Sequence, residues 1–214
     1  MKGYNIKKIK EFNHPTPNKP THGPTIFVQP EYGKKVQYVY VDESAKLTEK
    51  EIKKIQKIAG LFLYSGRVID TTIIHALNEI NIESTKATEK TREAVNHFLD
   101  YCATNPDAQI IYRASDMQLH INSDAAYLVA PKARSRAGGY HYLGNKDGKL
   151  FNGPIFILAK VIKAVMSSAA ESEVGGLYLN AREAIILIYT LEELGHIQDP
   201  VPIKTDNSTA KWHH

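Results

Sequence analysis

The sequence predicts an α/β protein in which a helical module comes before an α/β region. In that region we expect three antiparallel strands, then a helix, then a fourth strand that joins the same sheet in parallel. Two observations support this fold class. Apolar residues recur at helical spacing as far as residue 105, and after Asp107 their spacing becomes that of strands. A long helical pattern then separates the third long strand from a short one, which implies a parallel crossover. We therefore expect three regions, at residues 1–34, 35–108 and 109–214.

The composition is that of an ordinary globular protein. Hydrophobic residues make up 43% of the chain and charged residues 23%, which is enough apolar material for a core. The net charge of +4 is compatible with a polyanionic partner but does not by itself indicate one. The single cysteine, Cys102, excludes an intrachain disulfide. No apolar stretch reaches 18 residues and no leader pattern is present, so we expect a soluble, intracellular protein without a membrane partner.

The region 1–34 combines a short helix with a linker. Residues 1–12 place apolar side chains about three apart among lysines, as in a helix. Prolines recur through residues 13–31, and proline fixes φ and lacks an amide donor. We expect these residues to form an extended linker and prefer this interpretation to a proline-rich recognition motif.

The region 35–108 is predicted to hold three packed helices. Thr48 followed by Glu51 matches a capping box and begins a helix over residues 47–67. Asp70 and Thr88 are the expected N-caps of the next two helices. The third helix ends at the breaker cluster Asn105-Pro106-Asp107.

The region 109–214 is predicted to form the sheet. After a short strand at Ile110–Tyr112, longer strands are expected at residues 117–122, 138–143 and 154–159, with turn-forming residues 144–148 before the last of them. A helix from about residue 167 stops at Gly195, and a short strand at residues 201–205 leads into Asp206. We expect the core stripe of this helix to be Leu177, Ala181, Ile185, Ile188 and Leu191.

Three acidic residues stand out by their positions in this pattern. Asp124 ends a strand, Glu173 lies in the first turns of the long helix, and Asp206 ends the strand that follows it. Carboxylates at the ends of adjacent strands, with one from the helix packed over them, can converge at one edge of the sheet. Like charges brought together repel, whereas Mg²⁺ or Mn²⁺ between them would bind such oxygen ligands. An acidic residue after a strand is also a common turn or cap residue, so each position alone is weak evidence.

Five segments, in order, resemble the ribonuclease H domain of copia-type retrotransposons. There the blocks are a strand ending in SDA, a basic-Ser-x-Ser/Ala-Gly-aromatic strand, an SS-x-EAE helix start, LEELG and a strand ending in Asp. The matching segments here are SDAAYL at 123–128, ARSRAGGY at 133–140, SSAAESE at 167–173, LEELG at 191–195 and TDN at 205–207.

A weaker resemblance extends upstream. IAGLFLY at 58–64, followed by VID at 68–70, is similar to the segment after the polymerase palm of the same elements, and HFLDY at 97–101 is similar to a later helix. This implies a thumb or connection-like module in the first half of the chain. No Tyr-x-Asp-Asp sequence occurs, so the polymerase palm motif is absent.

The resemblance implies a ribonuclease H-like fold and metal-dependent hydrolysis of RNA in RNA–DNA hybrids, with two Mg²⁺ or Mn²⁺ ions and no small-molecule cofactor. Asp124, Glu173 and Asp206 match the family's catalytic, metal-binding positions, whereas Glu171 matches a neighbouring position that does not bind metal. The implied partners are the RNA–DNA hybrid and the remainder of the retroelement polyprotein, in a cytoplasmic particle or the nucleus.

Five other residues are candidates for nucleic-acid binding, namely Lys132, Arg134, Arg136, Asn207 and Ser208. The three basic residues are as consistent with a solvated loop as with phosphate contacts. Asn207 and Ser208 are as consistent with a helix cap as with substrate binding.

The resemblance also implies that the domain is incomplete after its fourth strand. The family's fourth acid lies on a later helix, beyond residue 214. The alternative function is therefore a catalytically inactive ribonuclease H-like remnant that binds nucleic acid or protein. An unrelated member of the same nuclease-like superfamily, such as an integrase, agrees with the strand and helix order but not with the SDA and EAE-like blocks.

Overall fold

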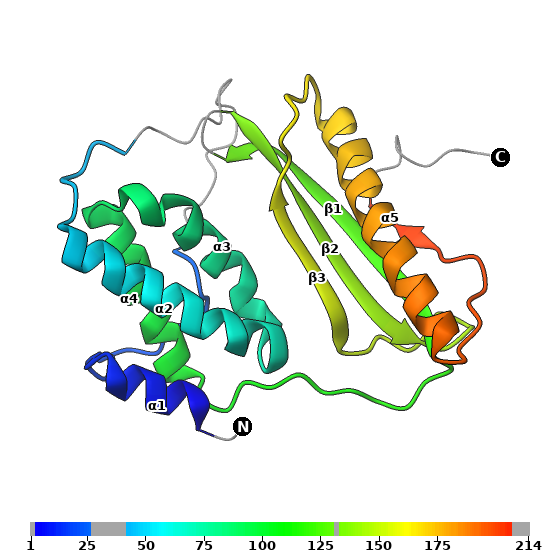
Figure 1. Cartoon of the computed structure of the whole chain (residues 1–214), viewed down its shortest axis with the longest axis horizontal. Coiled ribbons are helices and arrows are strands. Elements are labelled where there is room, and N and C mark those ends of the chain that lie inside the picture. Colours follow the sequence, from blue (N-terminus) through cyan, green and yellow to red (C-terminus); the bar gives the residue numbers. More distant parts are fainter. Residues whose placement is uncertain (1–2, 27–41, 131–132, 207–214) are drawn as a thin grey trace. The chain divides into compact units, whose positions relative to one another are not determined.

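The computed structural model describes residues 3–26, 42–130 and 133–206, and its described residues form two compact units. The first unit ends at Ile110 and the second begins at Ile111 (Figure 1). The first is helical and the second is α/β, as the change of apolar spacing predicts. In the described residues, no helix has both the length and the apolar character needed to cross a membrane.

The helical unit contains four α-helices and two short 3-10 turns. Its centre is apolar, with the buried rings of Phe62 and Phe98 meeting edge to face at a centroid distance of 5.2 Å. The three predicted helices and the short first helix are all present. The elements are α1 (Tyr4–Glu11), α2 (Glu49–Val68), η1 (Thr71–Ile73), α3 (Ile74–Glu83), η2 (Ser84–Lys86) and α4 (Glu89–Thr104).

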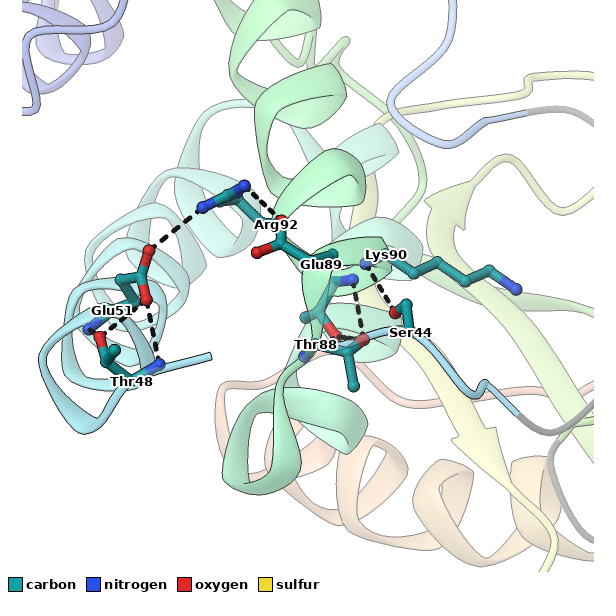
Figure 2. A network of polar contacts seen from close by, with 8 residues as sticks. Ser44, Thr48, Glu51, Thr88, Glu89, Lys90 and Arg92 are labelled. Carbon is teal, nitrogen blue, oxygen red and sulfur yellow. Dashed lines mark hydrogen bonds and ion pairs between the residues drawn. The ribbon is translucent and has the colours of Figure 1, made fainter. Parts of the chain in front are cut away.

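The helix starts form where the cap residues predict them (Figure 2). Thr48 accepts a hydrogen bond from the Glu51 backbone N–H, and the Glu51 carboxylate accepts one from the Thr48 backbone N–H. Thr88 and Thr91 form the same reciprocal box at the start of α4. Arg92 of α4 then reaches back to the Glu51 carboxylate at 3.1 Å, so the two capped helix starts are joined by an ion pair.

The proline-rich residues 14–26 are predicted to form an extended linker, and the structure shows which element they pack on. They belong to the helical unit and lie against α4. The His14 Nε2 and the Asp100 carboxylate are 2.7 Å apart, and the His97 Nε2 donates to the Gly23 carbonyl at 3.0 Å. Side chains of α4 therefore bind this extended, proline-rich segment to the helical unit. The proline content of the sequence does not reveal these contacts.

The α/β unit contains one mixed sheet in the order β3-β2-β1-β4. Strand β2 pairs antiparallel with both β1 and β3, and β4 pairs parallel with β1. This confirms the predicted fold class of three antiparallel strands, a helix and a parallel strand. The elements are β1 (Gln118–Ala130), β2 (Arg134–Gly144), β3 (Pro154–Val161), α5 (Ala169–Glu193) and β4 (Ile203–Lys204).

The strand predicted at Ile110–Tyr112 is wrong, because these residues form no strand. The Tyr112 hydroxyl donates to the Pro154 carbonyl. The Asn152 side chain accepts a hydrogen bond from the Arg113 backbone N–H and donates one to the Arg113 carbonyl. A buried asparagine side chain thus replaces the strand partner that a β-pattern requires.

Helix α5 lies along β1 and β2 (Figure 1). Its core stripe differs from the predicted one, since Ile185 is 53% exposed and Leu177 and Ile188 are only half-buried. Leu191 is buried as predicted. The other buried residues of α5 are smaller or more polar than the predicted ones, namely Ser172, Glu173, Gly176, Asn180 and Ala184. A pattern of large apolar residues cannot find these five positions.

Candidate metal centre

The register between β1 and β4 brings two of the candidate acids together. Ile121 pairs with Ile203 and Asn122 pairs with Lys204 in the parallel ladder. Continued by two residues, this register sets Asp206 beside Asp124. The prediction that Asp124 ends its strand is wrong, because β1 continues to Ala130 and Asp124 pairs with Gly138 inside the β1–β2 ladder. Both aspartates are exposed, so they can reach an ion or a substrate from solvent.

Glu173 reaches the same place from α5. Ser168 is the N-cap of this helix, and its side chain accepts from the Glu171 N–H at 3.1 Å. The Glu171 carboxylate turns back to the Ser167 N–H at 2.6 Å, so this residue caps the helix and does not join the acids. Two residues further on, Glu173 is 6% exposed. Residues two apart on a helix differ by about 200° in direction, which separates the two glutamates as predicted.

Glycine at position 176 allows α5 to come this close to β1. A Cβ placed there would lie 3.3 Å from the Ala125 Cβ and 3.4 Å from the Asp124 carbonyl oxygen. The contact with the Ala125 Cβ is tighter than side chains usually make, so a residue with a side chain at position 176 would force the helix and strand slightly apart. The Ala125 backbone N–H donates to the Glu173 carboxylate, and the Thr205 hydroxyl lies 3.5 Å from it.

The three acids therefore form one cluster. One carboxylate oxygen each from Asp124, Glu173 and Asp206 lies within 4.8 Å of the other two. Burial raises the pKa of Glu173, and the negative charges of Asp124 and Asp206 raise it further. Among the described residues, no lysine, arginine or histidine forms an ion pair with any of the three. The cluster is consequently electrostatically costly for the protein alone.

The donor set fits a divalent cation. Carboxylate oxygens are the hard ligands that Mg²⁺ and Mn²⁺ prefer, and ligands on opposite sides of a Mg²⁺ ion lie about 4.2 Å apart. The observed spread of 4.8 Å differs from this by an amount that a small side-chain rotation removes. A cation would also neutralise the charge that raises the pKa of Glu173.

The residues predicted to bind nucleic acid are placed only in part. Arg134 and Arg136 lie within strand β2 and not in a loop; Arg134 is exposed and Arg136 is half-buried. Arg136 is two residues from Gly138, the cross-strand partner of Asp124. Lys132, Asn207 and Ser208, which the sequence also suggests, lie outside the described residues.

A buried polar network beside the acids was not predicted from the sequence. It consists of Asn180 on α5, His141 on β2 and Ser123 on β1. The available signal was the polar Asn180 seven residues after Glu173, two turns along the same helix face. Such a residue is hard to separate from a solvent-facing one until the sheet-facing side of α5 is known.

Comparisons with known proteins add weak structural likenesses. No family model and no curated protein matches the sequence. Among solved structures, the chain is similar to the foamy viral protease–reverse transcriptase in complex with double-stranded DNA, at 16% identity and a TM-score of 0.43. It is also similar to a second such complex, of the form designated dRH, at 15% identity and a TM-score of 0.40. Each likeness covers 78% of this chain, which spans 40% and 33% of the two viral chains respectively.

Proposed function

We propose that the α/β unit is a ribonuclease H-type nuclease domain that hydrolyses RNA in RNA–DNA hybrids with Mg²⁺ or Mn²⁺. The observation that carries the proposal is the convergence of Asp124, Glu173 and Asp206, from β1, α5 and the end of β4, within 4.8 Å. The five sequence blocks shared with copia-type retroelements support the same function. By these blocks the chain would be part of a retroelement reverse transcriptase and ribonuclease H, with the helical unit as its thumb or connection.

The three acids would have different roles in binding the ions. Glu173 is buried and accepts the Ala125 N–H, so it provides a fixed oxygen ligand. Asp124 and Asp206 are exposed and can contact ions that also contact a phosphate. Two bound ions would supply an activated water and stabilise the charge that develops on the phosphodiester oxygens. Discrimination of RNA from DNA would use the 2′-hydroxyl group.

The direct test is cleavage of a labelled RNA–DNA hybrid in Mg²⁺ and in Mn²⁺. We expect cleavage by the wild-type chain and none above background from Asp124→Asn or Glu173→Gln. Glu171→Gln is the matched control, because Glu171 is two residues away and caps the helix outside the cluster. Equal activity in Glu171→Gln and Asp124→Asn would contradict the proposal. Duplex DNA and duplex RNA, offered as competing substrates, test the choice of hybrid.

A second candidate is a chain that binds nucleic acid without cleaving it. The exposed Arg134 and the nearby Arg136 favour this candidate, since both lie on the strand that pairs with β1 beside Asp124. A folded protein that binds the hybrid with salt-sensitive affinity, loses affinity in Arg134→Gln and cleaves in neither metal would support it over the nuclease.

A further inference from the structure

Asn180 is a polar side chain buried completely between α5 and the sheet. Its exposed fraction is 0%, and it lies on the buried face of α5 two turns after Glu173. A buried amide is costly unless its polar atoms have partners, so its partners indicate what it does.

The side-chain amide of Asn180 contacts both strands and its own helix. Its nitrogen lies 2.9 Å from the Gly138 carbonyl, 3.0 Å from the Gly176 carbonyl and 3.0 Å from the Ser123 hydroxyl. Because the two carbonyl groups can only accept, the amide nitrogen must face them. The amide oxygen is then left to accept from the His141 Nε2 at 2.9 Å. Burial lowers the pKa of His141, which is consistent with a neutral ring that carries its proton on Nε2.

Gly139 of β2 lies so close to this amide that no side chain fits at position 139. A Cβ at Gly139 would lie 1.8 Å from the Asn180 amide oxygen. The amide therefore occupies the volume that a side chain at position 139 would need. The packing of Asn180 on Gly139 and the absence of a side chain at Gly176 together set how closely α5 approaches β1 and β2.

The three partners of the Asn180 amide nitrogen lie close to proposed metal ligands, whereas His141, the partner of its oxygen, does not. Ser123 precedes Asp124, and Gly138 is the cross-strand partner of Asp124. Gly176 lies one turn after Glu173 on α5. We propose that Asn180 is a positioning residue for the metal centre, which holds Glu173 of α5 against Asp124 of β1 by tying helix and strands together. This inference rests on the metal centre described under the proposed function.

The test compares metal binding with thermal stability in the full chain. We expect Asn180→Ala and Asn180→Ser to weaken Mn²⁺ binding by about tenfold or more, as is usual when support of a metal ligand is lost. The Ala125 amide, which donates to Glu173, should also exchange faster with solvent in both variants without metal. Leu191→Ala is the control. It removes a buried side chain from the same helix more than four turns beyond Glu173, and should lower the Tm without changing either measurement.

The outcomes separate this inference from the proposed function. Wild-type Mn²⁺ affinity and wild-type Ala125 exchange in a folded Asn180→Ala or Asn180→Ser variant would overturn the positioning role. An equal loss of Mn²⁺ affinity in Leu191→Ala would overturn it too, by showing that general destabilisation is sufficient. A wild-type chain that binds no Mn²⁺ would instead overturn the metal centre, and Ala125 exchange alone would then decide whether Asn180 positions Glu173.

Discussion

Glu173 is a buried carboxyl group placed between two aspartates. Burial and the charges of Asp124 and Asp206 raise its pKa, so the folded protein holds the Glu173 proton to a higher pH than the unfolded chain does. As pH rises from the ordinary carboxyl pKa through the raised one, ionisation in the folded state lowers the free energy of unfolding. At neutral pH without metal, this residue therefore opposes folding.

Glu173→Gln should consequently stabilise the metal-free α/β unit at pH 7. Glutamine keeps an oxygen to accept the Ala125 N–H but removes the charge. We expect a Tm higher than that of the wild type in EDTA, with the difference shrinking as pH falls towards 4. The measurement is thermal unfolding followed by circular dichroism across pH, with Glu171→Gln alongside. A lower Tm for Glu173→Gln in EDTA at pH 7 would contradict the electrostatic interpretation.

Gly139 and Asn180 should be strongly coupled. Gly139→Ala places a methyl group 1.8 Å from the Asn180 amide oxygen, so we expect a loss of about 1–3 kcal/mol from overpacking. In an Asn180→Ala background the contacts with the amide disappear, while the 3.0 Å contact with the Leu158 Cβ remains. The cost of Gly139→Ala should then fall by more than half. Urea unfolding of the two single variants and the double variant measures this, and additive losses would show that the amide is not the obstacle.

At the scale of elements, the helix starts show which local signals are reliable. Thr48 and Thr88 both cap helices, but Thr88 is buried and its hydroxyl also bonds the Asp42 carboxylate. Thr48→Ala should cost about 1 kcal/mol of unfolding free energy, and Thr88→Ala should cost more, up to about 2 kcal/mol. Urea unfolding of the helical unit checks the order. Equal losses would mean that the contact with Asp42 contributes nothing to stability.

Helix α5 shows where element-level prediction is limited. Its existence and its approximate ends follow from the sequence, from Ser168 as a cap to Gly195 in the left-handed conformation at φ +91°. Its buried stripe does not follow, because helical periodicity assigns the core to large apolar residues. Here Gly176 and Asn180 face the sheet, since close approach and hydrogen bonding replace bulky packing at those positions.

At the scale of the whole molecule, a divalent cation should act on one unit alone. All three acids belong to the α/β unit, and only this unit should gain stability when the ion binds. We expect Mg²⁺ or Mn²⁺ at about 100 times its Kd to add about 2.7 kcal/mol there. Hydrogen exchange with and without EDTA measures protection in each unit separately. Equal protection of α2 and α5 by the metal, or its persistence in Asp124→Asn, would refute the assignment.

Much of the candidate site follows from local sequence. Asp124, Glu173 and Asp206 are identifiable because the sequence predicts each of them near the end of an element, and a parallel crossover brings such ends together. In the structure Asp124 lies within β1 and not at its end, since β1 continues to Ala130. The support of the site is less accessible. Asn180 of α5 is far in sequence from His141 and Gly139 of β2, and it meets them only across the interface between helix and strand. No periodicity or cap signal marks a contact of this kind.

The sequence by itself determined the helix caps, the α/β class, the positions of the long helices and of the strands in the sheet, and the three candidate acids, because these depend on spacing and short-range hydrogen bonds. The tertiary structure alone decided which face of α5 meets the sheet, how residues 14–26 lie against α4 and which buried groups surround Glu173. The reason is physical. Local propensity selects helices and strands, whereas the distance and rotation between them depend on volumes and partners contributed by distant segments of the chain.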